Sequence, residues 1–309
     1  MDPKLQALLD SVSRLAPRID LKASAVQARA AFWRAAQRLE ADAPLLHDRR
    51  ALRVDGGAGA LDARLYTPFA AGPIGPGLVY FHGGGFVMGD LDSHEMLCRR
   101  LAAAAHIRVL SVAYRLAPEH RFPAAVDDAE AAARWAFANA AAIGFDPARI
   151  ALGGDSAGGT LAAVAAQTLR RDPRSRLAAQ LLIYPCTQMV TMTPSQLKFR
   201  EGYVVTQAAQ DFFKDKYLAR REDAYDVRCS PLLENDLAGL PQTLCITAGF
   251  DPLLDEAKAY ADKLAAAGVP VTHRHYPNQP HGFFNMTAVS TAARHAIEDA
   301  GRWLAEALS

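Results

Sequence analysis

A serine between two glycines follows a short apolar run in "RIALGGDSAGG", residues 149–159. Gly154, Ser156 and Gly158 form the pattern G-x-S-x-G, with a predicted strand before it and an Ala-rich predicted helix after it. The two glycines remove side chains that would clash in so sharp a turn. The pattern predicts that Ser156 is a nucleophile, held in a strained turn with its hydroxyl exposed. The alternative is a glycine-rich turn without chemistry, which this context and a second glycine cluster upstream disfavour.

A serine nucleophile needs a general base, and the base needs an acid that orients it. Asp251 ends the predicted strand "QTLCITAGFD" and is the expected acid, whereas His281, in the loop "NQPHGFF" after the last predicted strand, is the expected base. The chain order of serine, acid and histidine fits this assignment. Asp255 and Glu256, about a helical turn beyond the acid, are expected to be surface or capping groups. Asp155 is expected to form hydrogen bonds within the serine turn.

The other histidines are expected to have structural roles or to face solvent. His273 and His275 flank Arg274 in a predicted strand, where alternation points both at the same face. The rest precede the serine turn or lie in predicted helices and loops: His47, His94, His106, His120 and His295.

Three consecutive glycines follow a predicted strand in "YFHGGGFVMGD". Acyl transfer places negative charge on the carbonyl oxygen of the substrate, and backbone N–H groups can stabilise that charge. Gly83 and Gly84 are expected to donate such groups together with Ala157, the residue after the nucleophile, while Gly85 gives the loop its bend. His82 is expected to hold the loop in shape through a hydrogen bond.

The elements that must position these residues alternate along the chain. Apolar runs rich in Val, Ile, Leu and Tyr predict strands at 61–68, 75–83, 107–115, 149–156, 178–185, 242–251 and 271–277. Ala- and Leu-rich segments predict helices at 93–105, 124–142, 157–171, 253–267 and 287–308. This alternation predicts an α/β fold, a mostly parallel sheet with helices on both faces and functional loops at the carboxyl ends of its strands.

Two regions depart from the alternation. Residues 1–48 are predicted to form helices at 4–15 and 25–39 with no strand between them. Residues 186–228 depart again, and there Thr206 is the expected N-cap of a helix that ends near Leu218. Neither region is long enough for a core of its own, so both are expected to be helical additions to one domain, residues 1–309.

The composition excludes several classes of protein. A net charge of +1 without a long basic run disfavours nucleic-acid binding, and no apolar stretch reaches the length of a membrane span or signal peptide. The four cysteines are scattered without a C-x-x-C pair, which indicates buried free thiols rather than disulfides or a metal site. A cytoplasmic protein is therefore expected.

With "HGGGF", "YRLAPEHRFPAAVDD", "GGDSAGG", "AGFDPLLDE" and "HGF" in this order, the chain resembles the bacterial hormone-sensitive-lipase-like (family IV) carboxylesterases over essentially its whole length. The resemblance implies an α/β-hydrolase sheet of about eight strands, a helical cap formed by about residues 1–48 and 186–228, and no cofactor. It assigns the same residues as above to a catalytic triad (Ser156, Asp251, His281) and an oxyanion hole (Gly83, Gly84, Ala157). Exposed edge strands in such a sheet would allow a homodimer.

The resemblance also implies roles for residues around the site. "EGYVVT" looks like the cap segment near the substrate, which makes Glu201 and Tyr203 candidate pocket residues. Arg115, Glu119 and His120 in "YRLAPEH" are expected to form a polar network or to lie exposed. Several aromatic residues are candidates to line an apolar pocket, or else to anchor the cap helices: Phe32, Trp33, Phe199, Tyr203, Phe212 and Phe213.

The expected activity is hydrolysis of a small-molecule ester with a short- to medium-chain acyl group, through an acyl-enzyme intermediate, since a compact cap leaves a restricted pocket. Hydrolysis of a lactone, amide or carbamate by the same triad is an alternative. A non-catalytic small-molecule receptor on this fold is a second alternative, which the presence of His281 disfavours.

Overall fold

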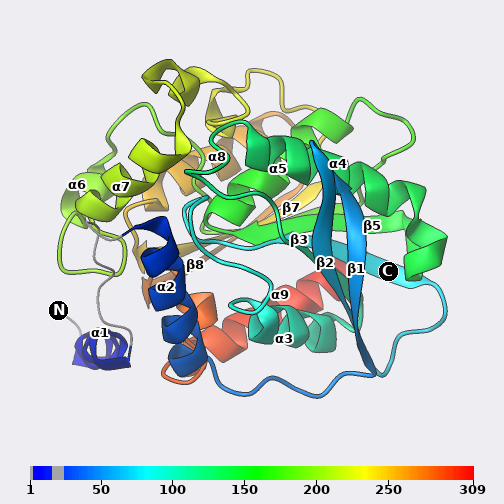
Figure 1. The fold of residues 1–309 in the computed structure, drawn as a ribbon, viewed down its shortest axis with the longest axis horizontal. Coiled ribbons are helices and arrows are strands. Elements are labelled where there is room, and N and C mark those ends of the chain that lie inside the picture. Colours follow the sequence, from blue (N-terminus) through cyan, green and yellow to red (C-terminus); the bar gives the residue numbers. More distant parts are fainter. Residues whose placement is uncertain (1–2, 16–23) are drawn as a thin grey trace.

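Eight strands form a single sheet in the computed structural model, which describes residues 3–15 and 24–309 (Figure 1). The strand order is β1-β2-β4-β3-β5-β6-β7-β8; β2 is antiparallel to β1 and β4, and every other neighbouring pair is parallel. The strands are β1 (Asp48–Gly56), β2 (Gly59–Thr67), β3 (Gly75–Phe81), β4 (Arg108–Val112), β5 (Phe145–Asp155), β6 (Ala179–Ile183), β7 (Gln242–Phe250) and β8 (Val271–Pro280). The predicted mostly parallel sheet is confirmed.

Helices cover both faces of this sheet, with α4, α5 and α8 on one side and α3 and α9 on the other (Figure 1). These helices are α3 (Glu95–Ala105), α4 (Ala124–Ala138), α5 (Ala157–Leu169), α8 (Leu254–Ala266) and α9 (Thr291–Ala307). Consecutive strand residues enter different cores: Val79 and Leu152 pack on the α4–α5 side, whereas Leu78 and Ala151 pack on the α3–α9 side. Because both faces are buried, the strands are apolar without alternation, which is why the sequence revealed them.

Strand β1 lies in a region where the sequence analysis predicted no strand, so that prediction was wrong. Most of its side chains are exposed, and within the part of the chain that the structure describes it pairs with β2 alone, at the edge of the sheet. An exposed edge strand has no apolar pattern to recognise, and its conformation comes from backbone pairing with β2.

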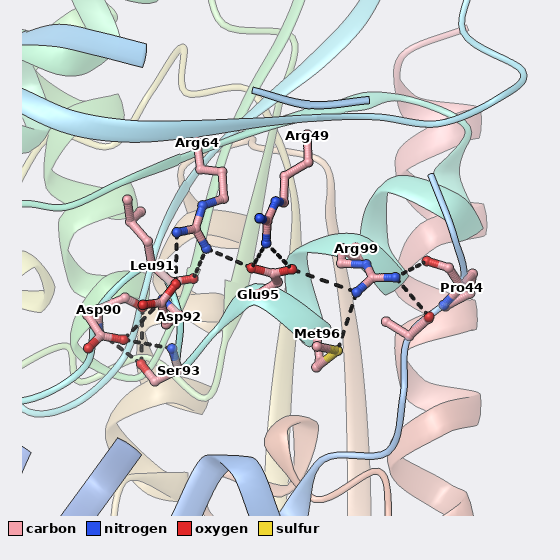
Figure 2. Close-up of polar contacts among 11 residues, drawn as sticks. Pro44, Arg49, Arg64, Asp90, Leu91, Asp92, Ser93, Glu95, Met96 and Arg99 are labelled. Atoms are coloured by element: carbon pink, nitrogen blue, oxygen red, sulfur yellow. Dashed lines mark hydrogen bonds and ion pairs between the residues drawn. The ribbon is translucent and has the colours of Figure 1, made fainter. Parts of the chain in front are cut away.

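Charged side chains fasten the β1–β2 hairpin and the preceding segment to α3, as Figure 2 shows. Arg49 on β1 donates to both Glu95 carboxylate oxygens at 2.8 Å, and Arg64 on β2 donates to the same carboxylate at 2.7 Å. Arg99, one turn along α3, donates to the Pro44 carbonyl oxygen at 2.9 Å. These bonds fix where the N-terminal region joins the sheet.

Four further helices gather at one end of the sheet and are called the cap helices below (Figure 1). They are α1 (Pro3–Leu15), α2 (Ala25–Leu39), α6 (Pro194–Lys198) and α7 (Gln207–Tyr217). Ser24 caps α2, and Thr206 caps α7 as predicted, its hydroxyl accepting the Ala209 N–H at 3.2 Å. Short 3₁₀ turns complete the described chain: Ala140–Ile143, Arg221–Tyr225, Pro231–Leu233 and Phe283–Asn285. Within the described residues, no helix has the length and apolarity to cross a bilayer.

Candidate active site

Ser156 occupies a strained turn between β5 and α5. Its backbone has φ 54° and ψ −119°, a conformation that residues other than glycine rarely adopt. A Cβ atom on Gly158 would lie 1.9 Å from the Phe81 carbonyl oxygen, so only glycine fits where α5 begins against β3. The turn presents the serine, which is partly exposed, at the carboxyl end of the sheet.

Three side chains from distant parts of the chain meet at this turn. His281 Nε2 lies 2.9 Å from Ser156 Oγ, and His281 Nδ1 lies 2.7 Å from Asp251 Oδ2. Asp251 directly follows β7 and is fully buried, and its other oxygen accepts the Leu253 N–H at 2.8 Å. An imidazole held in this way donates from Nδ1 and can accept the serine proton at Nε2.

The glycine loop differs from the prediction at Gly83. The Gly83 N–H donates to Asp155 Oδ1 at 2.9 Å, so it is occupied and does not serve as an oxyanion donor. Gly84 and Gly85, with φ of 121° and 63°, line the cavity at Ser156, and their N–H groups make no hydrogen bond to any described residue. The assignment of Gly83 was therefore wrong, because the Asp155 carboxylate binds its N–H group.

Asp155 binds this loop through its buried carboxylate. Its carboxylate accepts the Tyr80 hydroxyl at 2.7 Å as well as the Gly83 amide, and His94 Nε2 lies 3.5 Å from its second oxygen. Burial, the largest influence, raises the pKa of Asp155, but the nearby His94 and the hydrogen bonds from His94 and Tyr80 outweigh it and hold the pKa below its ordinary value. Asp155 is thus a buried carboxylate that orients the loop.

His82 contacts the same loop through a hydrogen bond. Its Nδ1 donates to the Gly83 carbonyl oxygen over 2.8 Å, and its ring stacks on Tyr114 at 4.3 Å. Burial, followed by the proximity of His94, lowers the pKa of His82 to about 4. The imidazole is therefore neutral near pH 7 and has a structural function.

Two cavities meet at the serine. The larger has a volume of about 400 Å³ and the smaller about 60 Å³, and five residues border both: Gly85, Ser156, Val205, Phe213 and His281. The larger cavity is mostly apolar and runs between α1, α2, α7 and the loop after His281. The smaller is lined by Phe86, Ala157, Cys186, Gln188, Met189, Gln196, Val205, Gln210, Lys214 and Leu253.

Four of the candidate pocket residues border the larger cavity: Phe32, Tyr203, Phe212 and Phe213. Trp33 is 42% exposed and Glu201 is also exposed, and neither residue lines either of the two cavities at Ser156, so both assignments were wrong. Trp33 follows Phe32 on α2, and successive helical side chains point about 100° apart. Phe199 is buried against Phe250 and anchors the cap helices.

The network expected in "YRLAPEH" does not form. Arg115 donates to the buried Asp128 carboxylate at 2.8 Å, whereas Glu119 pairs with Arg29 of α2 at 2.6 Å. His120 belongs to neither pair. The motif therefore connects two different elements, α4 and α2, to the loop that carries it.

Glu256 was wrongly expected at the surface. It is buried, and its carboxylate accepts the Thr187 and Gln188 N–H groups at 2.9 and 3.4 Å behind the smaller cavity. Burial raises the pKa of Glu256 to about 7.

Sequence reasoning missed two residues that support the triad and the loop. Tyr184, after β6, packs its ring 4.7 Å from that of His281, and Asn285 donates to Asp155 at 3.4 Å. Neither lies in a motif with a recognisable spacing, so only the folded chain reveals them. Among residues 3–15 and 24–309, no cluster of three or more His, Cys, Asp or Glu side chains could hold a metal ion.

Comparison with known proteins shows which family and which enzymes the chain is similar to. Residues 78–285 match the family described as alpha/beta hydrolase fold. The chain is 42% identical to the carboxylic ester hydrolase LipN of Mycobacterium tuberculosis, over 93% of this chain and 77% of that protein. It is 40% identical to an ethyl acetate hydrolase of Pseudomonas putida, over 77% of this chain and 76% of that protein.

Solved structures agree with these similarities. An ester-hydrolase from the metagenome of Lake Arreo, complexed with a bipyridine phosphonate derivative, superposes with a TM-score of 0.94 at 40% identity, covering 98% of both chains. The thermostable carboxylesterase EstE1, from a metagenomic library, superposes with a TM-score of 0.90 at 37% identity, covering 94% of this chain and 99% of that one.

Proposed function

The chain belongs to the alpha/beta hydrolase fold family and is a carboxylic ester hydrolase, and we propose that it hydrolyses esters of short- to medium-chain acids through an acyl-enzyme intermediate on Ser156. The observation that carries this proposal is the pair of short distances that link Ser156, His281 and Asp251 at the floor of a cavity of about 400 Å³. The volume limits the ester to a modest size.

In the first half-reaction His281 Nε2 takes the proton of Ser156 Oγ while Oγ attacks the ester carbonyl carbon. Asp251 keeps the Nδ1–H tautomer in place and stabilises the imidazolium that forms. The C–O bond to the alcohol then breaks, and His281 gives its proton to the departing oxygen.

The oxyanion of the tetrahedral intermediate is proposed to accept hydrogen bonds from the N–H groups of Gly84, Gly85 and Ala157. All three residues border the cavities at Ser156. The Ala157 N–H also stands at the positive end of α5, which favours negative charge there. Donors fixed by the backbone need no reorganisation when the charge develops.

In the second half-reaction water takes the place of the alcohol beside His281. The imidazole removes a proton from that water, hydroxide adds to the acyl carbon, and collapse of the second tetrahedral intermediate releases the acid and restores the Ser156 hydroxyl.

Replacing the nucleophile tests this assignment. Ser156→Ala removes the attacking oxygen without disturbing the buried elements around it, so kcat/KM for p-nitrophenyl acetate and butyrate should fall by roughly 10⁴-fold or more. Circular dichroism and the melting temperature should match those of the unchanged protein. Equal activity of the two proteins would contradict a nucleophilic role for Ser156.

The homodimer and the cytoplasmic location expected from the sequence stay predictions. In support of a dimer, β7 is the only described strand that pairs with β8, so the backbone groups along the outer edge of β8 can pair with a second copy.

A further inference from the structure

The two chain neighbours of the triad acid are both in contact with α6 or the loop that follows it. On one side of Asp251, the Ser195 hydroxyl of α6 donates to the Pro252 carbonyl oxygen at 2.8 Å. On the other side, the ring of Tyr203, in the loop between α6 and α7, stacks on Phe250 with 5.6 Å between the ring centroids and 26° between the ring planes. Asp251 therefore lies between two residues that segments of the cap hold in place.

Phe250 also connects the acid to the base. It is the last residue of β7 and pairs with Pro280, the last residue of β8. Asp251 and His281 directly follow this pair, so both side chains start from neighbouring positions at the end of the sheet. The distance of 2.7 Å between His281 Nδ1 and Asp251 Oδ2 consequently depends on where Phe250 and Pro280 lie.

Phe199 completes a cluster of three aromatic rings with Tyr203 and Phe250. Its ring centroid lies 5.2 Å from that of Tyr203 and 5.7 Å from that of Phe250, in edge-to-face contact with both. Tyr203 borders the larger cavity at Ser156, whereas Phe199 and Phe250 border neither of the two cavities. Tyr203 therefore connects the space available to the substrate with the residue that precedes the acid.

The loop that carries Tyr203 is largely exposed. Glu201 and Gly202 are exposed, and Val204 is 40% exposed. A Cβ atom on Gly202 would meet no other atom within 4 Å, so this part of the loop has open space around it. Because the loop buries so little surface elsewhere, we expect loss of the Tyr203 ring to release both the loop and the Phe250 side chain.

We propose that Tyr203 is a positioning residue, which keeps Asp251 and His281 aligned through Phe250, so that the cap affects the chemical step as well as substrate binding. This inference rests on the proposed function and refines it. A residue that only lines a cavity changes KM for the esters that fill the cavity, whereas a residue that positions the acid and the base changes kcat. Both half-reactions use His281, so kcat should fall whichever of them is slower.

Ethyl acetate tests the proposal because it is too small to fill a cavity of about 400 Å³. In Tyr203→Ala, kcat for this ester should fall about 10- to 100-fold while KM stays within about threefold, measured by titration of the released acid. Tyr203→Phe keeps the ring that stacks on Phe250, and its kcat should stay within about twofold of that of the unchanged protein. Tyr203→Leu replaces the alanine variant if melting curves show that Tyr203→Ala is unfolded.

Two comparison variants separate positioning from other effects. Phe212 borders the same cavity, but its ring packs against that of Phe213 at 5.7 Å. Phe212→Ala should therefore raise KM for octyl acetate and lower kcat for ethyl acetate by no more than about twofold. Tyr225→Ala removes a tyrosine that is 67% exposed, and it should change neither constant.

A folded Tyr203→Ala with unchanged kcat, or a Tyr203→Phe that is as slow as the alanine variant, would overturn the positioning role. An equal loss of kcat in Phe212→Ala would also overturn it, because the effect would then belong to the cavity wall in general. In each of these cases, hydrolysis of ethyl acetate by the unchanged protein leaves the proposed function in place. If the unchanged protein hydrolyses neither ethyl acetate nor p-nitrophenyl acetate nor octyl acetate, the proposed function fails and this inference fails with it.

Discussion

The residue next to the nucleophile, Asp155, connects the serine turn to the glycine loop. Asp155 shares one carboxylate between Tyr80 on β3 and the Gly83 amide, so the serine turn and the glycine loop are fixed to the same buried charge. A positive φ at Ser156 costs of order 1–3 kcal/mol and persists only where the surroundings enforce it. The Asp155 bonds are part of that enforcement.

Asp155→Ala should therefore impair turnover without removing any reacting group. The Gly83 N–H loses its acceptor, the following Gly84 and Gly85 amides shift, and kcat should fall about 10- to 100-fold with little change in KM. Steady-state kinetics with p-nitrophenyl butyrate measure both constants.

Asp155→Asn is the conservative comparison, since its amide oxygen can still accept from Tyr80 and Gly83. It should retain more of kcat than the alanine variant does. A folded Asp155→Ala with unchanged kcat would show that the glycine loop keeps its shape without the carboxylate.

The difference between the expected and observed sites has a physical cause. Ser156, Asp251 and His281 were selected because chain order and strand ends constrain where they lie. The direction of the Gly83 N–H depends on where the loop turns and on a carboxylate 72 residues later. The spacing of residues near Gly83 predicts neither of these. Burial of Glu256 likewise depends on which face of α8 meets the segment after β6.

Among the elements, α2 has an unusual attachment to the site. Arg29 donates to the carbonyl oxygens of Val87 and Ala117 at 2.8 and 2.9 Å and pairs with Glu119 at 2.6 Å. Val87 lies just after the glycine loop, so one guanidinium joins a cap helix to the segment that carries the proposed oxyanion donors. The ion pair is partly exposed to solvent and contributes little, whereas the two hydrogen bonds to carbonyl oxygens are partly buried.

Arg29→Met should loosen α2 while leaving the triad in place. Because α2 borders the larger cavity, KM for octyl acetate should rise about three- to tenfold while kcat stays within about twofold. Trypsin should also cut the N-terminal region faster. The control is Arg34→Met, at an exposed position on the same helix, and it should change neither the KM nor the rate of trypsin cleavage. Equal behaviour of the two variants would contradict the attachment of α2 through Arg29.

Some helices and strands could be predicted from their own residues, and others depend on contacts with distant parts of the chain. The strands buried on both faces and the capped helix α7 were predictable, since burial on two faces and a threonine N-cap both leave a sequence signal. Strand β1 was not predictable in this way. Its Arg49 faces solvent on one side and Glu95 of α3 on the other, a pairing that exists only after the sheet has assembled.

At the scale of the whole molecule, the buried carboxyl of Glu256 is unfavourable to ionise. In the folded chain the pKa of this carboxyl is raised from its ordinary 4.5 to about 7, mainly by burial. Between these values the folded protein keeps the proton while the unfolded chain has lost it. Since the unfolded state then binds fewer protons, the free energy of unfolding contributed by this group falls as pH rises through the window from 4.5 to 7.

Glu256→Gln removes this titration, and its effect on global unfolding should consequently depend on pH. The free energy of unfolding of the unchanged protein, relative to that of the variant, should be lower at pH 8 than at pH 5 by up to about 3 kcal/mol, since a shift of one pKa unit corresponds to about 1.4 kcal/mol. Urea denaturation at both pH values measures the difference, and the exposed Glu222→Gln provides the reference for a glutamate without burial. A difference that does not change with pH would mean that the buried carboxyl ionises at its ordinary pKa, and that Lys214 and the surrounding amides stabilise its charge as well as water does.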